Sequence, residues 1–262
     1  MNVQSFWQKL PVIVIILALA TSTVNLYGQQ NSNRKVKVAF VYTGTSPELV
    51  EYMERELKEQ LGDQVELMNY AVPSVLEKIR KTGYVTANPA AEMVGTYMDA
   101  VESGADAILN ICSSVGDVVH SVQDLSKYIG VPIVMINEEM CREAVRKGNK
   151  IAVIATLPTS IEPTKNIIIR VSREMGKHVE VTGVLIDGAY GLEQEQFKAR
   201  LTAETEKIAG QVDVIVFAQG SMAYCENLIA DRFQKLVLSN PYFGVKALKT
   251  ALIDKGLIIK PE

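Results

Sequence analysis

Cysteine and histidine are scarce in this sequence. It holds three cysteines, Cys112, Cys141 and Cys225, and two histidines, His120 and His178. Their number and irregular spacing exclude a disulfide framework and a zinc knuckle, and no metal site is expected. Because the cysteine count is odd, at least one thiol stays unpaired within the chain, while a Cys141–Cys225 bridge remains open.

An excess of charge of one sign is also lacking. The chain has 27 Lys and Arg against 30 Asp and Glu, for a net charge of -3, and no basic cluster stands out. A nucleic-acid surface needs such a cluster, so no nucleic-acid partner is expected. The composition, 48% hydrophobic and 22% charged, is that of an ordinary globular protein, and no Pro/Gly/Ser-rich linker divides it.

The N-terminal apolar run is short for a membrane span. Residues 10–20 (LPVIVIILALA) follow Lys9 and give way to a polar segment. This run is about half of the ~20 apolar residues that a transmembrane helix needs. We interpret residues 1–30 as a signal peptide and expect export to the periplasm, with the mature domain beginning near Arg34. The alternative is an uncleaved segment that anchors the domain, and membrane contact is expected through this segment alone.

From Val36 onward, short β-branched runs alternate with longer amphipathic segments. This pattern is typical of parallel sheets connected by crossover helices, and it predicts an α/β fold. The expected strands are residues 36–42, 65–70, 107–111, 132–135, 151–155, 179–184, 214–217 and 236–238. The expected helices are residues 47–61, 89–103, 115–128, 138–147, 159–174, 192–209 and 242–255.

Two halves of the chain are diverged copies of one another. The segment DAILNICSSV from Asp106 matches DVIVFAQGSM from Asp213, which places Cys112 opposite Gln219. An earlier pair, KVAFVYTGTS and KIAVIATLPT, places Thr43 opposite Thr156. The repeat predicts two pseudo-symmetric lobes, each a parallel sheet flanked by helices, with the chemistry at the strand ends between them.

The repeat also aligns Asn137 with Asn240, each between the last strand of its half and a helix. We therefore expect each half to pass its following helix to the other lobe. Lobe one is then residues 34–136 plus 239–262, and lobe two is residues 137–238.

Cys112 is the first candidate for catalysis. It follows a buried-strand pattern and precedes Ser113 and Ser114, which are good helix caps. The amides at a helix N-terminus favour a thiolate, so the pKa of Cys112 is expected below its ordinary ~8.5. The alternative is that Cys112 is a small buried apolar residue.

Hydroxyl and amide donors gather at the other strand-to-helix junctions. They occur at matched positions in both halves, so they are expected to line one crevice. Such a ring of donors can hold a carboxylate without a cation. Each is also an ordinary helix cap when taken alone. The candidates for substrate binding are Thr43, Gly44, Thr156, Thr159, Gln219, Gly220 and Ser221.

Longer passages resemble the aspartate/glutamate/hydantoin racemase family over residues 36–253. They are ESGADAILNICSSVGD around Cys112, INEEMCREAVRKGNKIAVIATLPTSIEPT from Ile136, VDVIVFAQGSM, and NPYFGVKAL. The resemblance implies two pseudo-symmetric lobes and cofactor-independent proton transfer beside the carboxylate of a small substrate, with one cysteine from each lobe. It implies Cys112 as the first catalytic cysteine, substrate contacts from Thr43 and the loop 156–159, and amides of Ser113 and Ser114 that hold the carboxylate. Relatives are often dimers or larger, so a homodimer is one option, and the sequence leaves the oligomeric state open.

The sequence departs from this family where the second cysteine falls on Gln219. An amide exchanges no proton at neutral pH, which excludes a symmetric two-thiol mechanism. Cys225 lies six positions later. Two interpretations of it are open: it replaces the missing acid, or it is a packing or surface residue. Tyr42, Tyr190 and Tyr242 either close the pocket or pack elsewhere.

Three functions therefore remain open. The first is a racemase or isomerase with Cys112 as base or nucleophile. The second is a one-thiol decarboxylase or double-bond isomerase. The third is an exported two-lobe solute-binding protein that catalyses nothing, which a signal peptide before two α/β lobes also fits.

Overall fold

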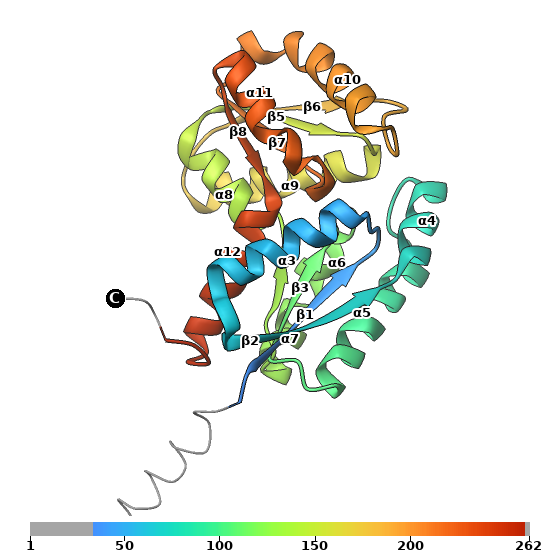
Figure 1. Cartoon of the computed structure of the whole chain (residues 1–262), viewed down its shortest axis with the longest axis vertical. Coiled ribbons are helices and arrows are strands. Elements are labelled where there is room, and N and C mark those ends of the chain that lie inside the picture. Colours follow the sequence, from blue (N-terminus) through green and yellow to red (C-terminus); the bar gives the residue numbers. More distant parts are fainter. Residues whose placement is uncertain (1–33, 260–262) are drawn as a thin grey trace, which may run out of the picture. The chain divides into compact units, whose positions relative to one another are not determined.

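The strands of the chain form two parallel sheets of four strands each (Figure 1). The computed structural model describes residues 34–259, and the segment interpreted as a signal peptide lies outside them. The sheet orders are β2-β1-β3-β4 and β6-β5-β7-β8. The strands are β1 (Val36–Tyr42), β2 (Val65–Ala71), β3 (Ala107–Ile111), β4 (Ile133–Met135), β5 (Lys150–Ala155), β6 (Glu180–Leu185), β7 (Val214–Phe217) and β8 (Leu236–Ser239). The predicted α/β class with two parallel-sheet lobes is confirmed, and every expected strand is present.

The central strands β3 and β7 are buried along their whole length, whereas the edge strands β2 and β6 are partly exposed. Helices on both faces of a parallel sheet bury its central strands, which accounts for their continuous apolar runs. The helices are α3 (Pro47–Leu61), α4 (Pro73–Thr82), α5 (Ala87–Glu102), α6 (Gly116–Ser121), α7 (Gln123–Ile129), α8 (Glu138–Lys147), α9 (Pro158–Glu174), α10 (Gln194–Glu206), α11 (Glu226–Phe233) and α12 (Asn240–Asp254).

The prediction of a single helix over residues 115–128 is wrong. The segment is a short 3₁₀ helix, η2 (Ser113–Val115), followed by α6 and α7. At the break, the Gln123 side-chain amide donates to the carbonyls of Val119 (2.8 Å) and Ile133 (3.0 Å). Gln123 therefore ties the break to β4, a long-range contact that the helical periodicity does not contain.

The two sheets repeat one another in detail. Val38 of β1 pairs with Ala107 of β3, and the residues aligned with them by the repeat, Ile151 and Val214, pair in the same register. In the first sheet the Asp106 carboxylate accepts the Lys37 amide at 2.8 Å. In the second sheet the Asp213 carboxylate accepts the amide of Lys150, the counterpart of Lys37, at 2.9 Å. The predicted duplication is thus present in hydrogen bonds as well as in sequence.

Two helices connect the halves. Helix α8, which follows β4 of the first sheet, packs on α9 and against β7 and β8 of the second. Helix α12, which follows β8, packs on α3 and against β3 and β4 of the first sheet. One apolar cluster also joins the halves, since it contains Val115 and Met135 together with Ile167 and Ala218. The lobe boundaries themselves stay a prediction.

The close contact of α12 with Ile136, the residue after β4, depends on Gly244. A Cβ at this position would lie 2.6 Å from Ile136 Cγ1 and 3.1 Å from the Ile136 carbonyl oxygen, so backbone as well as side chain would have to shift. Gly244→Ala is expected to lower the free energy of unfolding by about 2 kcal/mol, as overpacking does. Urea denaturation followed by circular dichroism measures the change.

Gly95 in α5 is the matched control, because a Cβ there would have no atom within 4 Å. Gly95→Ala is expected to stabilise the protein by about 0.5–1 kcal/mol through helix propensity alone. If both alanine substitutions raised the free energy of unfolding by the same amount, the close contact at Gly244 would be contradicted.

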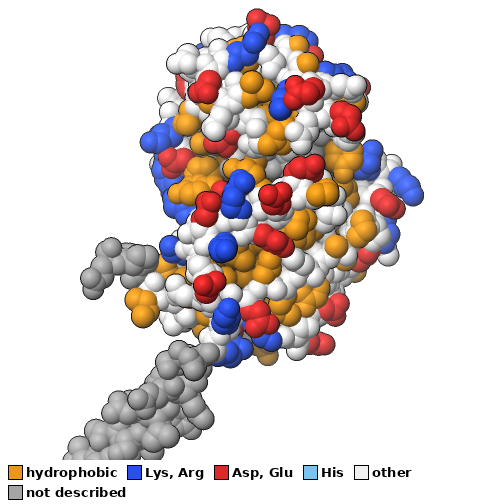
Figure 2. Space-filling view, viewed as in Figure 1, with side chains coloured by type: hydrophobic (Ala, Val, Ile, Leu, Met, Phe, Trp, Pro, Cys, Tyr) orange, Lys and Arg blue, Asp and Glu red, His pale blue; other side chains and the backbone are white. Residues whose placement is uncertain are grey.

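The described surface carries charges of both signs. On the face shown in Figure 2, Lys and Arg side chains are interspersed with Asp and Glu. Some form helical ion pairs, such as Lys198–Glu195 and Lys207–Glu204, both at 2.7 Å. Exposed pairs of this kind contribute little to stability. Within residues 34–259, no helix has the length and apolar character that crossing a bilayer requires.

Candidate active site

A cavity of about 340 Å³ lies at the carboxyl ends of the central strands of both sheets. Loops after β1 and β3 form one wall, and loops after β5, β6 and β7 form another. Strand ends at such a crevice are where open parallel sheets bind ligands. The predicted site residues that line the cavity are Thr43, Gly44, Cys112, Ser113, Ser114, Thr156, Gln219, Gly220 and Ser221. Thr159 does not line it.

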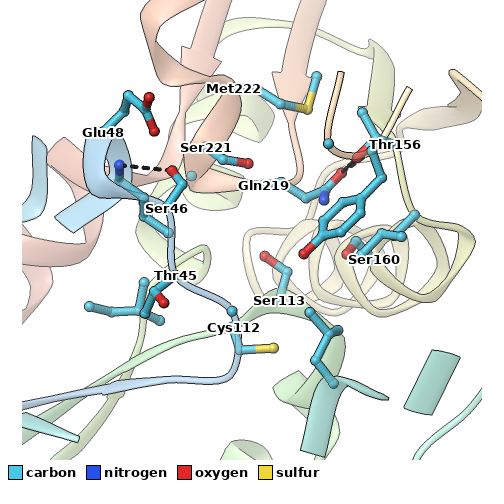
Figure 3. Close-up of a pocket in the computed structure, with 18 of the residues that line it drawn as sticks. Thr45, Ser46, Glu48, Cys112, Ser113, Thr156, Ser160, Gln219, Ser221 and Met222 are labelled. Carbon is cyan, nitrogen blue, oxygen red and sulfur yellow. Dashed lines mark hydrogen bonds between the residues drawn. The ribbon is translucent and has the colours of Figure 1, made fainter. Parts of the chain in front are cut away.

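Cys112 lies where β3 ends, directly before η2, and it is half-buried (Figure 3). Its backbone carbonyl accepts the Asn110 side-chain amide at 2.9 Å. The Asn110 carbonyl oxygen in turn accepts the hydroxyl of Tyr97 at 3.0 Å. Both Asn110 and Tyr97 are fully buried, so this chain of hydrogen bonds holds the backbone of Cys112 against the core.

Burial raises the pKa of the Cys112 thiol above its ordinary value. Hydrogen bonds from the Thr43 hydroxyl, from the amides of Ser114 and Val115, and from the Ser114 hydroxyl oppose the shift. The donors expected at the helix start are therefore present, but the prediction of a lowered pKa is wrong. Desolvation disfavours the thiolate more than the donors stabilise it, and the resting side chain is a neutral thiol at pH 7.

The raised pKa of Cys112 predicts how fast its thiol is alkylated at different pH values. Iodoacetamide is expected to modify Cys112 alone in the folded protein, because Cys141 and Cys225 are fully buried. The rate at pH 7 should lie below that of a free cysteine and should keep rising as the pH passes 9. Mass spectrometry of tryptic peptides measures it, and unfolding in urea should expose all three thiols. A rate that levels off below pH 8 would contradict the raised pKa.

Gln219 occupies the position matched to Cys112, and its side chain is held in one orientation. Its carbonyl oxygen accepts the backbone amide of Thr156 at 2.6 Å and the Thr156 hydroxyl at 2.9 Å (Figure 3). A backbone N–H only donates, so the atom that it contacts must be the oxygen. The Gln219 NH₂ group is therefore the end left for the cavity. It can donate hydrogen bonds but cannot act as a base.

In each lobe, the threonine that follows the first strand donates a hydrogen bond to a residue just after the central strand. Thr43 donates to the Cys112 thiol in lobe one, and its counterpart Thr156 donates to Gln219 in lobe two. The duplication has thus kept the threonine and its contact while the partner changed from thiol to amide. Any acid–base chemistry by Cys112 has no thiol counterpart at the matched position.

The serines after Cys112 connect the lobes. The Ser113 hydroxyl donates to the carbonyl of Ala218, the residue before Gln219. The Ser114 hydroxyl lies 3.1 Å from the hydroxyls of both Thr159 and Ser160 on α9. Thr159 is therefore placed behind Ser114. The Ser114 amide contacts the Cys112 sulfur, so it supports the thiol rather than standing free for a carboxylate.

Donors free for a ligand come from both walls. The hydroxyls of Thr45 and Ser221 line the cavity and make no hydrogen bond with any residue between 34 and 259. With the Gln219 NH₂ group they can satisfy one carboxylate or a developing enediolate. Gly220 stays small for a steric reason, since a Cβ there would lie 2.9 Å from Leu49 Cδ1 and 3.0 Å from Asn240 Oδ1.

Sequence reasoning left several lining residues out of the site. Glu48 and Leu76 line it from the first half, and Leu192, Phe197 and Tyr224 line it from the second. They come from helices or from loops whose reach across the cavity no local motif encodes. Tyr190, one of three tyrosines considered, does line the cavity, and its hydroxyl lies 3.7 Å from the place of a Cβ on Gly44.

The other candidates lie elsewhere. Tyr42 is buried in the core, and the half-exposed Tyr242 packs edge-on against Phe243, outside the cavity lining. Cys225 is fully buried outside that lining, at the junction of the 3₁₀ helix η4 (Gly220–Cys225) and α11, where burial raises its pKa to about 11. Within residues 34–259 the three cysteines are unpaired, and no cluster of His, Cys, Asp or Glu could hold a metal ion.

A family model described as Asp/Glu/Hydantoin racemase matches residues 38–248. The chain belongs to this family. The resemblance seen in the sequence is confirmed, and membership makes the chain an enzyme of the racemase and isomerase class. No curated protein sequence matches the chain.

Several solved structures of racemases and isomerases have the same fold. Allantoin racemase from Klebsiella pneumoniae is 16% identical with a TM-score of 0.56, over 86% of this chain and 91% of that one. Glutamate racemase RacE1 from Bacillus anthracis is 14% identical with a TM-score of 0.65, over 86% of this chain and 84% of that one. Maleate isomerase Iso from Pseudomonas putida S16 is 15% identical with a TM-score of 0.53, over 84% and 94%. At these identities the similarity shows the two-lobe fold alone.

Proposed function

We propose that this family member is a cofactor-free isomerase that moves the proton on a carbon beside the carboxylate of a small, amino-acid-like substrate, with Cys112 as its catalytic thiol. The observation that carries the proposal is the pairing of Cys112 and Gln219 in one cavity. Cys112 presents a thiol supported by Thr43, while Gln219 presents only N–H donors because Thr156 holds its oxygen.

The reaction begins with ionisation of the thiol. The neutral Cys112 releases its proton to water, and the thiolate then takes the proton from the substrate carbon. The C–H bond breaks, an S–H bond forms, and the electron pair passes into the carboxylate to give an enediolate. Gln219, Thr45 and Ser221 line the same cavity, and in this proposal the Gln219 NH₂ group and the two hydroxyls donate to that charge. Return of the proton from the same sulfur regenerates the starting configuration, whereas a proton delivered by water to the opposite face of the enediolate gives the other isomer. The hydroxide that this water leaves is neutralised by the proton that Cys112 released.

This mechanism makes proton exchange faster than inversion. Amino acids incubated with the protein in heavy water should lose their Cα–H signal in the NMR spectrum faster than they change configuration, which chiral chromatography measures. Equal rates of exchange and inversion would require a second proton donor across from Cys112 and would overturn the one-thiol mechanism.

The glutamine at position 219 also favours a second candidate, the isomerisation of a carbon–carbon double bond. The Cys112 thiolate would add to one alkene carbon as a proton adds to the other. Rotation about the resulting single bond and elimination of the thiolate and that proton would give the other isomer. This route needs one thiol and no second base.

The two candidates differ in measurable products. Conversion of maleate to fumarate, or of the monocarboxylate cis-2-butenoate to its trans isomer, without exchange of amino-acid Cα–H would favour the double-bond isomerase. Exchange without alkene isomerisation favours the first candidate. Binding of small acids with neither reaction would point to a solute-binding protein.

A further inference from the structure

Among residues 34–259, Glu48 is the one charged side chain that lines the cavity. It lies in the first turn of α3, and its carboxylate is at the rim of the cavity, on the same side as Ser46 (Figure 3). It forms no ion pair with the residues between 34 and 259. Hydrogen bonds from its own backbone amide and from the Ser46 hydroxyl lower its pKa, so Glu48 is ionised at neutral pH.

The field of Glu48 extends to the opposite wall. Tyr224, in η4 of the second half, lines the same cavity. Burial raises the pKa of the Tyr224 hydroxyl, the adjacent Cys225 raises it further, and the negative charges of Glu48 and Glu195 add a smaller increase. A ligand group between these walls therefore lies near a carboxylate, with no Lys or Arg among the described lining residues.

Two cations beside lining residues, Lys198 next to Phe197 and Arg80 next to Tyr190, are already engaged. Lys198 pairs with Glu195 at 2.7 Å, and the Arg80 guanidinium lies 4.9 Å from the centre of the Tyr190 ring, outside the cavity lining. Much of the remaining wall is apolar, with Leu49, Leu76, Leu192, Phe197 and Met222. Neutral donors can hold one carboxylate, but a second one would face apolar side chains and Glu48 without a cation.

We propose that the cavity selects substrates with one carboxylate and a distal group that is neutral or positively charged, and that Glu48 rejects dicarboxylates such as glutamate and aspartate. This inference rests on the proposed function only in assigning the cavity as the substrate site. The preference is a property of binding, so it can be measured apart from turnover.

Protection of Cys112 from iodoacetamide at pH 9 provides that measurement. Glutarate, pentanoate and 5-aminopentanoate have the same chain length and differ in the charge of the distal group. Glutarate is expected to need at least tenfold higher concentration than the other two for half-protection. Glu48→Gln should reduce this ratio, and Glu48→Lys should reverse it.

Glu51→Lys is the matched control, because Glu51 is exposed on the same helix and does not line the cavity. It changes the net charge by the same amount and should leave the ratio unchanged. Equal protection by glutarate and pentanoate in the wild type, or equal effects of the Glu48→Lys and Glu51→Lys variants, would overturn the inference.

Failure of the proposed function can be distinguished from failure of the charge preference. If neither glutamine nor glutamate exchanges Cα–H and no alkene isomerises, the catalytic proposal fails while the protection series still decides the charge preference. If glutamate exchanges faster than glutamine, catalysis stands and the charge preference falls.

Discussion

Replacing Cys112 with serine is expected to lower the rate of Cα–H exchange roughly 10³-fold or more. Serine keeps the size of the side chain and can accept the same hydrogen bonds from Thr43 and from the amides of Ser114 and Val115. Its hydroxyl, however, is too weakly acidic to supply an anion at neutral pH. The effect should therefore fall on kcat, with KM for the exchanging amino acid changed only a few-fold, and NMR in heavy water measures both.

Cys225→Ala is the control for loss of a thiol as such. Cys225 is buried outside the cavity lining, so this variant should keep the exchange rate within about twofold at temperatures where it is folded. If Cys112→Ser retained more than a tenth of the wild-type rate, Cys112 would be removed from the chemistry. A large rise in KM at constant kcat would instead make it a binding residue.

The pH dependence of the reaction follows from the same thiol. Burial raises the pKa of Cys112, so the thiolate fraction is small at pH 7 and grows as the pH passes the ordinary thiol value. Exchange catalysed by the thiolate should increase over that interval in wild type. A rate that fell over the same interval would indicate that the protonated thiol acts as an acid, as a decarboxylase requires.

Much of the fold could be predicted from the sequence because the strong signals are local. The β-branched runs of β1, β3, β5 and β7 are buried almost throughout, and their apolar character stands out in the sequence. Helix α4 was missed, although Pro73 starts it and Gly83 ends it in a left-handed conformation. Helix α11 was also missed, because it is short and buries only Ile229.

The site was predictable where the duplication marks it. Matched positions after the central strands place Thr43 and Cys112 in one wall and Thr156 and Gln219 in the other. The charge state of Cys112 was not predictable, since it depends on how far burial outweighs the donors around the sulfur. The locked orientation of Gln219 and the presence of Glu48 depend on contacts between distant segments, which spacing along the chain does not show.

Introducing a second thiol provides the strongest test of the duplicated design. Gln219→Cys is expected to raise the ratio of inverted to retained product by roughly 10²-fold. The new sulfur would lie at the position matched to Cys112, and the Thr156 amide and hydroxyl that now contact the Gln219 oxygen could stabilise its anion. One thiol could then remove the proton and the other could return it on the opposite face. Chiral chromatography combined with heavy-water exchange measures the ratio.

Gln219→Ser is the matched control, because it removes the amide and adds a small hydroxyl that is not acidic enough to exchange a proton. It should slow exchange about 10²-fold through loss of the NH₂ donor, without gaining inversion. The double variant Cys112→Ser/Gln219→Cys should again retain configuration, now with the base on the other face and with the opposite enantiomer as the faster-exchanging substrate. If Gln219→Cys exchanged protons without inversion, the two strand ends would not present opposite faces to the substrate, and the glutamine could not be the reason that one face lacks a proton donor.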